Sequence, residues 1–178
     1  MDSRRPPVEI AARYLAAGNL PSGNGYGADR GKGITHWALD IANPVGADVV
    51  APEDGAITHR WDDDTTAPFA GYGPGGVLML GASGLFHLLA HMTPTVTIGQ
   101  HVGIGDVVGR TARLAVASHC HWEVRVKPID SPVRGSSYPY RGDNTVNPIA
   151  WLGGASTASS SGWWVVALVL AYVVSRSR

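Results

Sequence analysis

Two histidines near position 120 have the spacing of neighbours on one face of a β-strand. Alternation of side chains along a strand predicts one face that carries His119, His121, Glu123 and Arg125. The opposite face would carry Cys120, Trp122, Val124 and Val126. The two imidazoles would stand about 6.6 Å apart, so one can bind a metal while the other acts on water or a substrate beside it. The alternative is a pair of half-buried histidines in a sheet.

A second pair of candidate ligands lies upstream, in the segment GITHWALDIANP at residues 33–44. His36 and Asp40 are four residues apart, which in a helix would place them on one face. The glycines before the pair and Pro44 after it favour a loop that runs into a strand, where the two side chains can still converge. With a histidine from the strand, they would supply three zinc ligands and leave a fourth position open for water.

Composition limits the partners of the protein more than its fold. The 178 residues are enough for one domain with a hydrophobic core. Lys plus Arg and Asp plus Glu both number 14, so the formal net charge is zero and we expect no nucleic-acid partner. Cys120 is the only cysteine, which rules out an internal disulfide, and we interpret it as a small buried hydrophobe rather than a zinc ligand.

Short apolar runs bounded by Gly, Pro or Asp predict a mainly β protein with a small antiparallel sheet or sandwich as its core. Residues 8–17 predict a short N-terminal helix that ends at Gly18 and Asn19, and a glycine-rich loop follows at 21–33. Besides the strand around His119, we expect strands at 48–52, 55–61, 76–81 and 85–91.

The sequence pattern changes after Lys127 and again near the C-terminus. A Pro-, Ser-, Gly- and Tyr-rich stretch predicts a loop that wraps the domain, and a Ser/Gly-rich stretch after it predicts a flexible linker. We therefore divide the chain into an N-terminal helix and loop (1–33), a core domain (34–127), a wrapping loop (128–152), a linker (153–162) and a hydrophobic C-terminal segment (163–178).

The C-terminal segment contains twelve uninterrupted apolar or aromatic residues, 163–174. As a helix they would cover about 18 Å, less than the roughly 30 Å hydrocarbon core of a bilayer. The tryptophan pair at one end and the two arginines at the other are typical of interfacial anchors. The segment predicts a hydrophobic helix that associates with a membrane, the alternative being an element packed on the domain.

Several motifs together resemble those of the lysostaphin-type zinc metallopeptidases, which cut peptide bonds in bacterial peptidoglycan. The resemblance runs from about Ile34 to Arg125, with the motifs in order and at sensible spacings. It rests on HxxxD at 36–40, APEDG at 51–55, GYG at 71–73, His91, GQ at 99–100, GDVVG at 105–109 and HxH at 119–121.

The resemblance implies a zinc endopeptidase that acts on the peptide stems or cross-bridges of peptidoglycan. It implies that Zn²⁺ is held by His36, Asp40 and His121, and that the catalytic residues beside it are His91 and His119. One of these two would take a proton while the other steadies the developing oxyanion or protonates the leaving amine. The alternatives are an inactive structural or membrane-anchored virion protein on the same fold and a phosphocarrier domain, for which the HxH motif is superfluous.

Some positions depart from the family pattern and leave the expected ligands intact. Ala38 stands where the family commonly has Gly, and Leu89 stands where it commonly has Tyr. Residues 111–118 lack the usual Gly/Ser/Thr-rich run. Three further histidines match no family motif, and we expect ordinary, partly exposed side chains at His59, His87 and His101.

The N-terminal residues do not form the hydrophobic region of a signal peptide, whereas peptidoglycan lies outside the cytoplasm. Bacteriophage lytic proteins combine these two features. We therefore expect a phage-encoded enzyme that is virion-associated or membrane-anchored and acts on the host cell wall at entry or exit. Its C-terminal segment would contact a lipid membrane or virion proteins.

Overall fold

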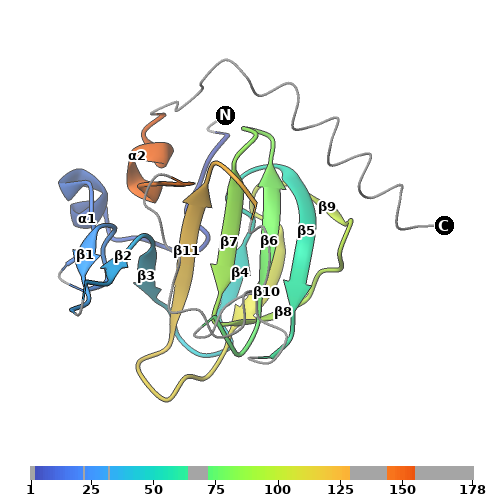
Figure 1. The fold of residues 1–178 in the computed structure, drawn as a ribbon. Helices are drawn as coiled ribbons and strands as arrows, with labels where there is room; N and C mark the ends of the chain where they lie inside the picture. The colour runs from blue at the N-terminus through green and yellow to red at the C-terminus, as the bar shows by residue number, and fades with distance from the viewer. Residues whose placement is uncertain (1–2, 22, 32, 64–71, 129–143, 155–178) are drawn as a thin grey trace.

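The computed structural model describes residues 3–21, 23–31, 33–63, 72–128 and 144–154 (Figure 1). Short strands dominate it, as the frequent glycine and proline breaks predict. In chain order the elements are α1 (Ala12–Ala17), β1 (Ala28–Asp29), β2 (Thr35–His36), β3 (Leu39–Ala42), β4 (Asp48–Val50), β5 (Gly55–Trp61), β6 (Gly76–Gly81), β7 (Phe86–Ala90), β8 (Met92–Pro94), β9 (His101–Val102), β10 (Val107–Thr111), β11 (His119–Arg125), β12 (Thr145–Val146) and α2 (Pro148–Leu152).

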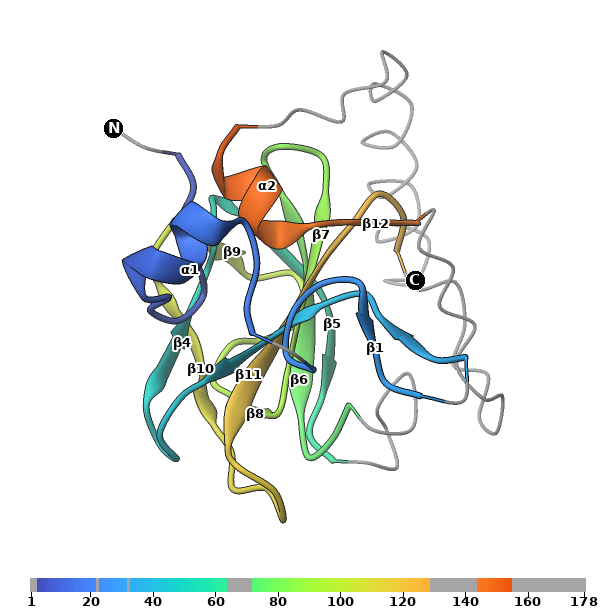
Figure 2. The ribbon, with the colours of Figure 1, turned by 90° about the vertical axis from the view of Figure 1, so that its left-hand side faces the viewer.

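The main sheet is antiparallel and has the order β12-β11-β7-β6-β5-β9. Strand β3 also pairs with β11, alongside its first half, while β12 pairs with its last residues. Strands β4, β10 and β8 form a second antiparallel sheet that lies behind the main one (Figures 1 and 2). A small hairpin of β1 and β2 lies beside β3. The predicted mainly β, antiparallel fold is confirmed.

The two faces of the main sheet have different neighbours. One face packs into the core cluster that also contains Val49, Met92 and Val108 of the second sheet. The other face carries His121 and Glu123, together with a smaller apolar cluster from β5, β6, β7 and the segment before β6. Gly76 is required on this face, because a Cβ there would lie 2.2 Å from the Trp61 ring. We call these two surfaces the core face and the site face.

The central strands agree with the sequence prediction better than the ends of the chain do. Strands β5 and β6 have the predicted bounds, and Cys120 is buried in the core as expected. Helix α1 is shorter than predicted, because Val8 and Ile10 are core residues that precede it. It does end at Gly18, in the left-handed conformation.

The prediction of a wrapping loop at 128–152 is wrong for its last part, which forms β12 and α2. Asn147 caps α2 by accepting a hydrogen bond from the Ile149 amide, and Pro148 occupies the first turn, where its missing N–H has no cost. These two signals were present in the sequence. The predicted C-terminal segment, and the predicted linker apart from Gly153 and Gly154, lie outside the described residues. None of the described helices is long and apolar enough to cross a membrane.

Candidate active site

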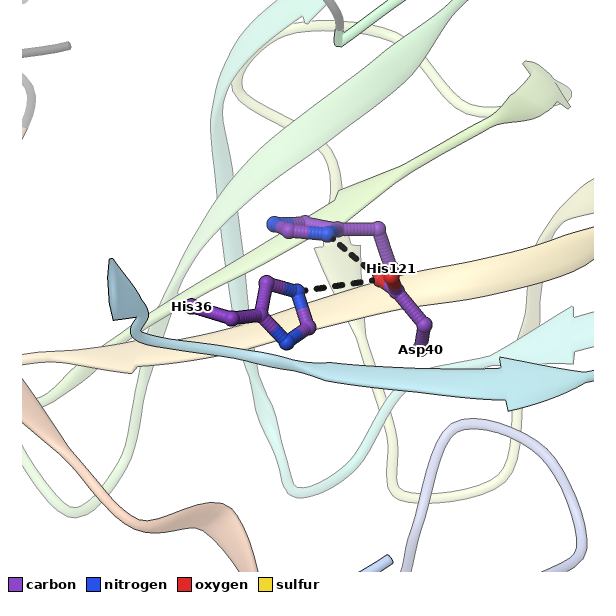
Figure 3. Close-up of side chains that lie close together, drawn as sticks. All are labelled: His36, Asp40 and His121. Atoms are coloured by element: carbon purple, nitrogen blue, oxygen red, sulfur yellow. Dashed lines mark hydrogen bonds and ion pairs between the residues drawn. The ribbon is translucent and has the colours of Figure 1, made fainter. Parts of the chain in front are cut away.

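Strand pairing brings the two predicted ligand motifs together. Strands β3 and β11 are antiparallel neighbours, and Asp40 lies directly opposite His121 in their register. On an antiparallel pair, directly opposed residues point to the same face. The His121 Nδ1 atom lies 2.8 Å from Asp40 Oδ1, and Figure 3 shows both side chains pointing toward His36.

His36 completes a cluster whose geometry suits a metal ion. Its ring centroid is 5.4 Å from that of His121, and its Nε2 atom is 3.3 Å from Asp40 Oδ1. His36 Nδ1 lies 3.1 Å from the Gly25 carbonyl, so Nδ1 donates and Nε2 keeps its lone pair. That buried Nε2 has no hydrogen-bond partner among the described residues. A buried nitrogen lone pair without a partner, beside a carboxylate and a second imidazole, fits Zn²⁺.

Charge at the cluster is concentrated on Asp40. Burial alone would raise its pKa, but the hydrogen bond to His121 and charge interactions with His121 and His36 outweigh burial and hold the pKa well below its usual range. The carboxylate is therefore ionised at any working pH. Arg30 Nη2 lies 2.5 Å from Asp40 Oδ2, so the second oxygen faces a cation while Oδ1 faces the histidines. Asp40 is thereby restricted to presenting one oxygen to the cluster.

His91 reaches the site through an unusual backbone conformation. The residue follows the last residue of β7 and has φ 64°, which is rare outside glycine. Its ring centroid lies 4.6 Å from that of His119 and 5.7 Å from that of His121. Its Nδ1 donates to the Gly73 carbonyl at 2.5 Å, so Nε2 keeps the lone pair. Burial lowers the pKa of His91 to about 4, and the ring is neutral at pH 7.

His119 lies at the edge of the same cluster and is more accessible. Its side chain is 17 % exposed, and its Nε2 atom is 3.7 Å from Asp40 Oδ1. Its Nδ1 donates to the Ala117 carbonyl at 2.8 Å, which leaves the lone pair on Nε2. The five residues singled out from sequence, including both members of the HxH pair, therefore converge on one side of the main sheet.

Three residues of the site had no assigned role in the sequence analysis. Glu123 Oε1 lies 3.0 Å from His121 Nε2, and Tyr72 donates a hydrogen bond to the same oxygen. Strand alternation did place Glu123 on the face that carries the histidines, and Tyr72 belongs to the GYG motif at 71–73, so the sequence contained a pattern that could have identified each of them. No such pattern identifies Arg30, because only the β1–β2 hairpin brings it to Asp40.

The prediction for His87 is wrong. Instead of being partly exposed, it is fully buried on the core face, where Trp122 Nε1 donates to its Nδ1 at 3.2 Å and its Nε2 donates to Glu53 at 2.7 Å. His59 and His101 are exposed, as expected for histidines outside the site.

The comparisons with known proteins agree with this site. The profile of peptidase family M23 matches residues 34–134, more than half of the chain. The chain belongs to peptidase family M23. It is therefore a zinc metallopeptidase, as the sequence motifs predicted. His36, Asp40 and His121 are a group of three potential metal ligands whose ligand atoms lie within 4.8 Å of one another.

Solved structures show that this M23 peptidase shares the lysostaphin fold. The catalytic domain of lysostaphin from Staphylococcus simulans is 18 % identical, with a TM-score of 0.56 over 82 % of this chain and 99 % of that one. The catalytic domain of EnpA, a prophage-encoded M23 protein from Enterococcus faecalis, is 22 % identical, with a TM-score of 0.51 over 73 % and 87 %. A longer lysostaphin structure is 17 % identical, with a TM-score of 0.59, and 58 % of it is covered. No curated protein sequence matches the chain.

Proposed function

We propose that this M23 peptidase cleaves peptide bonds in bacterial peptidoglycan, with Zn²⁺ held by His36, Asp40 and His121 and with His91 and His119 as the catalytic residues. The observation that carries the ligand assignment is the buried His36 Nε2, which has no hydrogen-bond partner in the described residues and lies beside a charged carboxylate. The substrate class rests on the lysostaphin fold, which the chain shares with a peptidase described as antimicrobial.

The chain's own residues divide the chemistry between them. When bound, zinc supplies Lewis-acid polarisation of the scissile carbonyl and makes a water molecule more acidic. His91 and His119 each hold their Nδ1 proton on a main-chain carbonyl, and each therefore presents an Nε2 lone pair. One accepts the proton of the attacking water, and the other steadies the developing oxyanion or protonates the leaving amine. The fixed Nδ1 contacts mean that neither ring has to change tautomer before it accepts a proton.

The test measures zinc content and the release of new amino groups from purified cell walls by the full chain. Wild-type protein should contain one zinc per chain and digest the walls, and a chelator should stop both. His121→Ala should lose zinc and activity, whereas His59→Ala, an exposed histidine outside the site, should keep both. One tightly bound zinc in His121→Ala would contradict the ligand assignment. A zinc-loaded wild-type chain that releases no amino groups would contradict the peptidoglycan substrate.

We further propose that the enzyme is phage-encoded, acts on the host wall from a virion or a membrane, and is tethered by residues 163–174. Two observations support this. Twelve consecutive apolar residues after a Ser/Gly-rich stretch need cover from lipid or protein, because an exposed apolar segment would aggregate. EnpA, which has the same fold, is described as prophage-encoded.

Flotation with liposomes tests the tether. The full chain should float with the liposomes, and a chain that ends at Ser161 should remain in the soluble fraction while it digests purified walls at the same rate. A full chain that stays soluble and monomeric would contradict the tether. That result would mean that the segment packs on the enzyme instead.

A further inference from the structure

Glu123 is a charged side chain placed where burial is expensive. It is fully buried, two residues after His121 on the same face of β11. A buried carboxylate is tolerated only when donors satisfy its oxygens. Three groups surround it: Tyr72 donates to Oε1, His121 Nε2 lies 3.0 Å from Oε1, and Arg125 Nη1 donates to Oε2 at 2.6 Å. Both oxygens of this carboxylate are therefore used.

The chemistry of these contacts determines which nitrogen of His121 keeps its proton when the residue binds a metal. An ionised carboxylate is only an acceptor, so His121 Nε2 must be the donor in its contact with Glu123. While no metal is bound, Nδ1 likewise donates to the ionised Asp40, so His121 carries a proton on each nitrogen. A metal that binds His121 takes the place of one of these protons, and the contact with Glu123 keeps the other on Nε2. Nδ1 is the atom that faces Asp40 and the His36 ring, at 2.8 Å from Asp40 Oδ1. Glu123 thus directs the lone pair of His121 into the cluster.

The carboxylate is itself held in place from two directions. Tyr72 comes from the segment before β6, and its ring centroid lies 5.3 Å from that of His121, so it both contacts the imidazole and fixes its acceptor. Arg125 lies two residues beyond Glu123 on the same strand and holds the other oxygen. Because Tyr72 and Glu123 are both buried, the carboxylate cannot turn without breaking at least one of these bonds.

From these contacts we propose that Glu123, supported by Tyr72 and Arg125, is a positioning residue that sets the tautomer and the ring orientation of His121 for zinc binding. The inference rests on the proposed function, in which His121 is a zinc ligand. Groups that hydrogen-bond a metal-binding histidine typically contribute about 10- to 100-fold to metal affinity. Loss of Glu123 therefore weakens zinc binding even though Glu123 does not contact the metal.

The test measures zinc affinity of full-length variants by competition with a chromophoric chelator. Glu123→Ala should bind zinc about 10- to 100-fold more weakly than wild type. Glu123→Gln should lose less, because its amide oxygen can still accept from His121 and Tyr72. Tyr72→Phe, which keeps the ring and removes one donor, should also show a smaller loss. The visible spectrum of the Co²⁺-substituted protein should change in Glu123→Ala, since the geometry at His121 changes.

The matched control is Glu53→Gln. Glu53 is the buried carboxylate partner of His87 on the core face, so this variant disturbs a buried His–carboxylate pair without touching the cluster. Its zinc affinity and Co²⁺ spectrum should equal those of wild type. An equal loss of zinc affinity in Glu53→Gln and Glu123→Gln would overturn the inference, because general loosening of the fold would then explain both.

Wild-type zinc affinity in folded Glu123→Ala, with an unchanged Co²⁺ spectrum, would also overturn it. If that variant does not fold, Glu123→Gln and Tyr72→Phe take its place in the test, and wild-type zinc affinity in both would contradict the inference. His121→Ala is measured in parallel to separate the two proposals. If it retains tight zinc, the ligand assignment fails; if it loses zinc while the Glu123 and Tyr72 variants do not, only the positioning role fails.

Discussion

Two buried clusters in this protein use the same residue types and do different things. On the core face, His87 has both ring nitrogens paired, one with Trp122 and one with Glu53. On the site face, His36 has a buried Nε2 with no hydrogen-bond partner in the described part of the chain. The rings of His91 and His119 lie beside this cluster, and each is held through Nδ1, which leaves its lone pair on Nε2.

The two clusters differ in whether the protein itself supplies hydrogen-bond partners for all their polar atoms. The Glu53 carboxylate accepts hydrogen bonds from Ser83 Oγ at 2.6 Å, from the Ser83 amide at 2.9 Å and from His87. Its partners are therefore all groups of the protein. Burial is the main cause of the lowered pKa of His87, which is neutral. A satisfied pair of this kind stabilises the fold and has nothing left with which to bind a ligand. An incompletely satisfied cluster of the same groups is where metal chemistry is expected.

The sharpest test of this contrast exchanges one carboxylate from each cluster for alanine. Asp40→Ala should lose more zinc affinity than the roughly 10- to 100-fold loss expected when a residue bonded to a ligand is removed, and with it wall digestion. Glu53→Ala should keep its zinc but lose about 1–3 kcal/mol of stability, because the buried His87 N–H loses its acceptor. Zinc titration and chemical denaturation measure the two effects. If both variants lost similar stability and kept their zinc affinity, the proposed difference between a metal-binding cluster and a structural cluster would be wrong.

The two accessible histidines sharpen the comparison within the site face. His91→Ala and His119→Ala should each retain zinc and lose about 10² to 10⁴ in the rate of wall digestion, since positioned acid–base groups contribute that much. His101→Ala is the matched control, because this exposed histidine lies outside the cluster. Release of amino groups under saturating zinc gives the rates. A near-wild-type rate in either variant would remove that histidine from the mechanism.

In the metal-free protein, the two clusters should affect the pH dependence of stability in different ways. Burial opposes protonation of His121, but hydrogen bonds to Asp40 and Glu123 outweigh it and raise the pKa to about 9. The folded state therefore binds a proton more tightly than the unfolded chain does, which stabilises the folded state. This contribution to the free energy of unfolding is complete below about pH 6.5 and is lost as pH rises through about 9. With a chelator present, the free energy of unfolding should fall by up to about 1 kcal/mol per pH unit in that window.

His121→Gln should flatten this slope. His87→Gln should leave it unchanged, because the pKa of His87 is lowered and its contribution changes only in the acidic range. Urea denaturation at several pH values decides. Identical slopes for wild type and His121→Gln between pH 7 and 9 would contradict the prediction.

The smallest expected effect concerns Arg30, whose side chain is 38 % exposed. Arg30→Met removes its ion pair with Asp40, and an exposed pair of this kind contributes about 0.2–1 kcal/mol. We expect a correspondingly small change in thermal stability and zinc retained. If zinc binding were abolished, Arg30 would have to be counted with the site's essential residues.

The outcome of the sequence analysis varied with how local each signal was. Alternation along β11 depends only on strand geometry, and it correctly placed His119, His121 and Glu123 on one face. The same argument applied to β7 failed. Alternation along the predicted strand at 85–91 would put His87 and His91, four residues apart, on one face. The left-handed backbone at His91 ends the alternation, and His87 points into the core while His91 joins the site.

Sequence alone predicted the central strands and the burial of Cys120, because periodicity is a property of the chain itself, and the resemblance of its motifs to those of a known family identified the five cluster residues. The convergence of the site was decided by tertiary structure. The β3–β11 register sets Asp40 against His121, and the β1–β2 hairpin brings Arg30 to the same carboxylate. Whether both ring nitrogens of a histidine are hydrogen-bonded, or one remains available for a ligand, depends on partners distant in sequence, such as Glu53 for His87 and Gly73 for His91. No local pattern encodes those distances, since they arise only when the sheets pack.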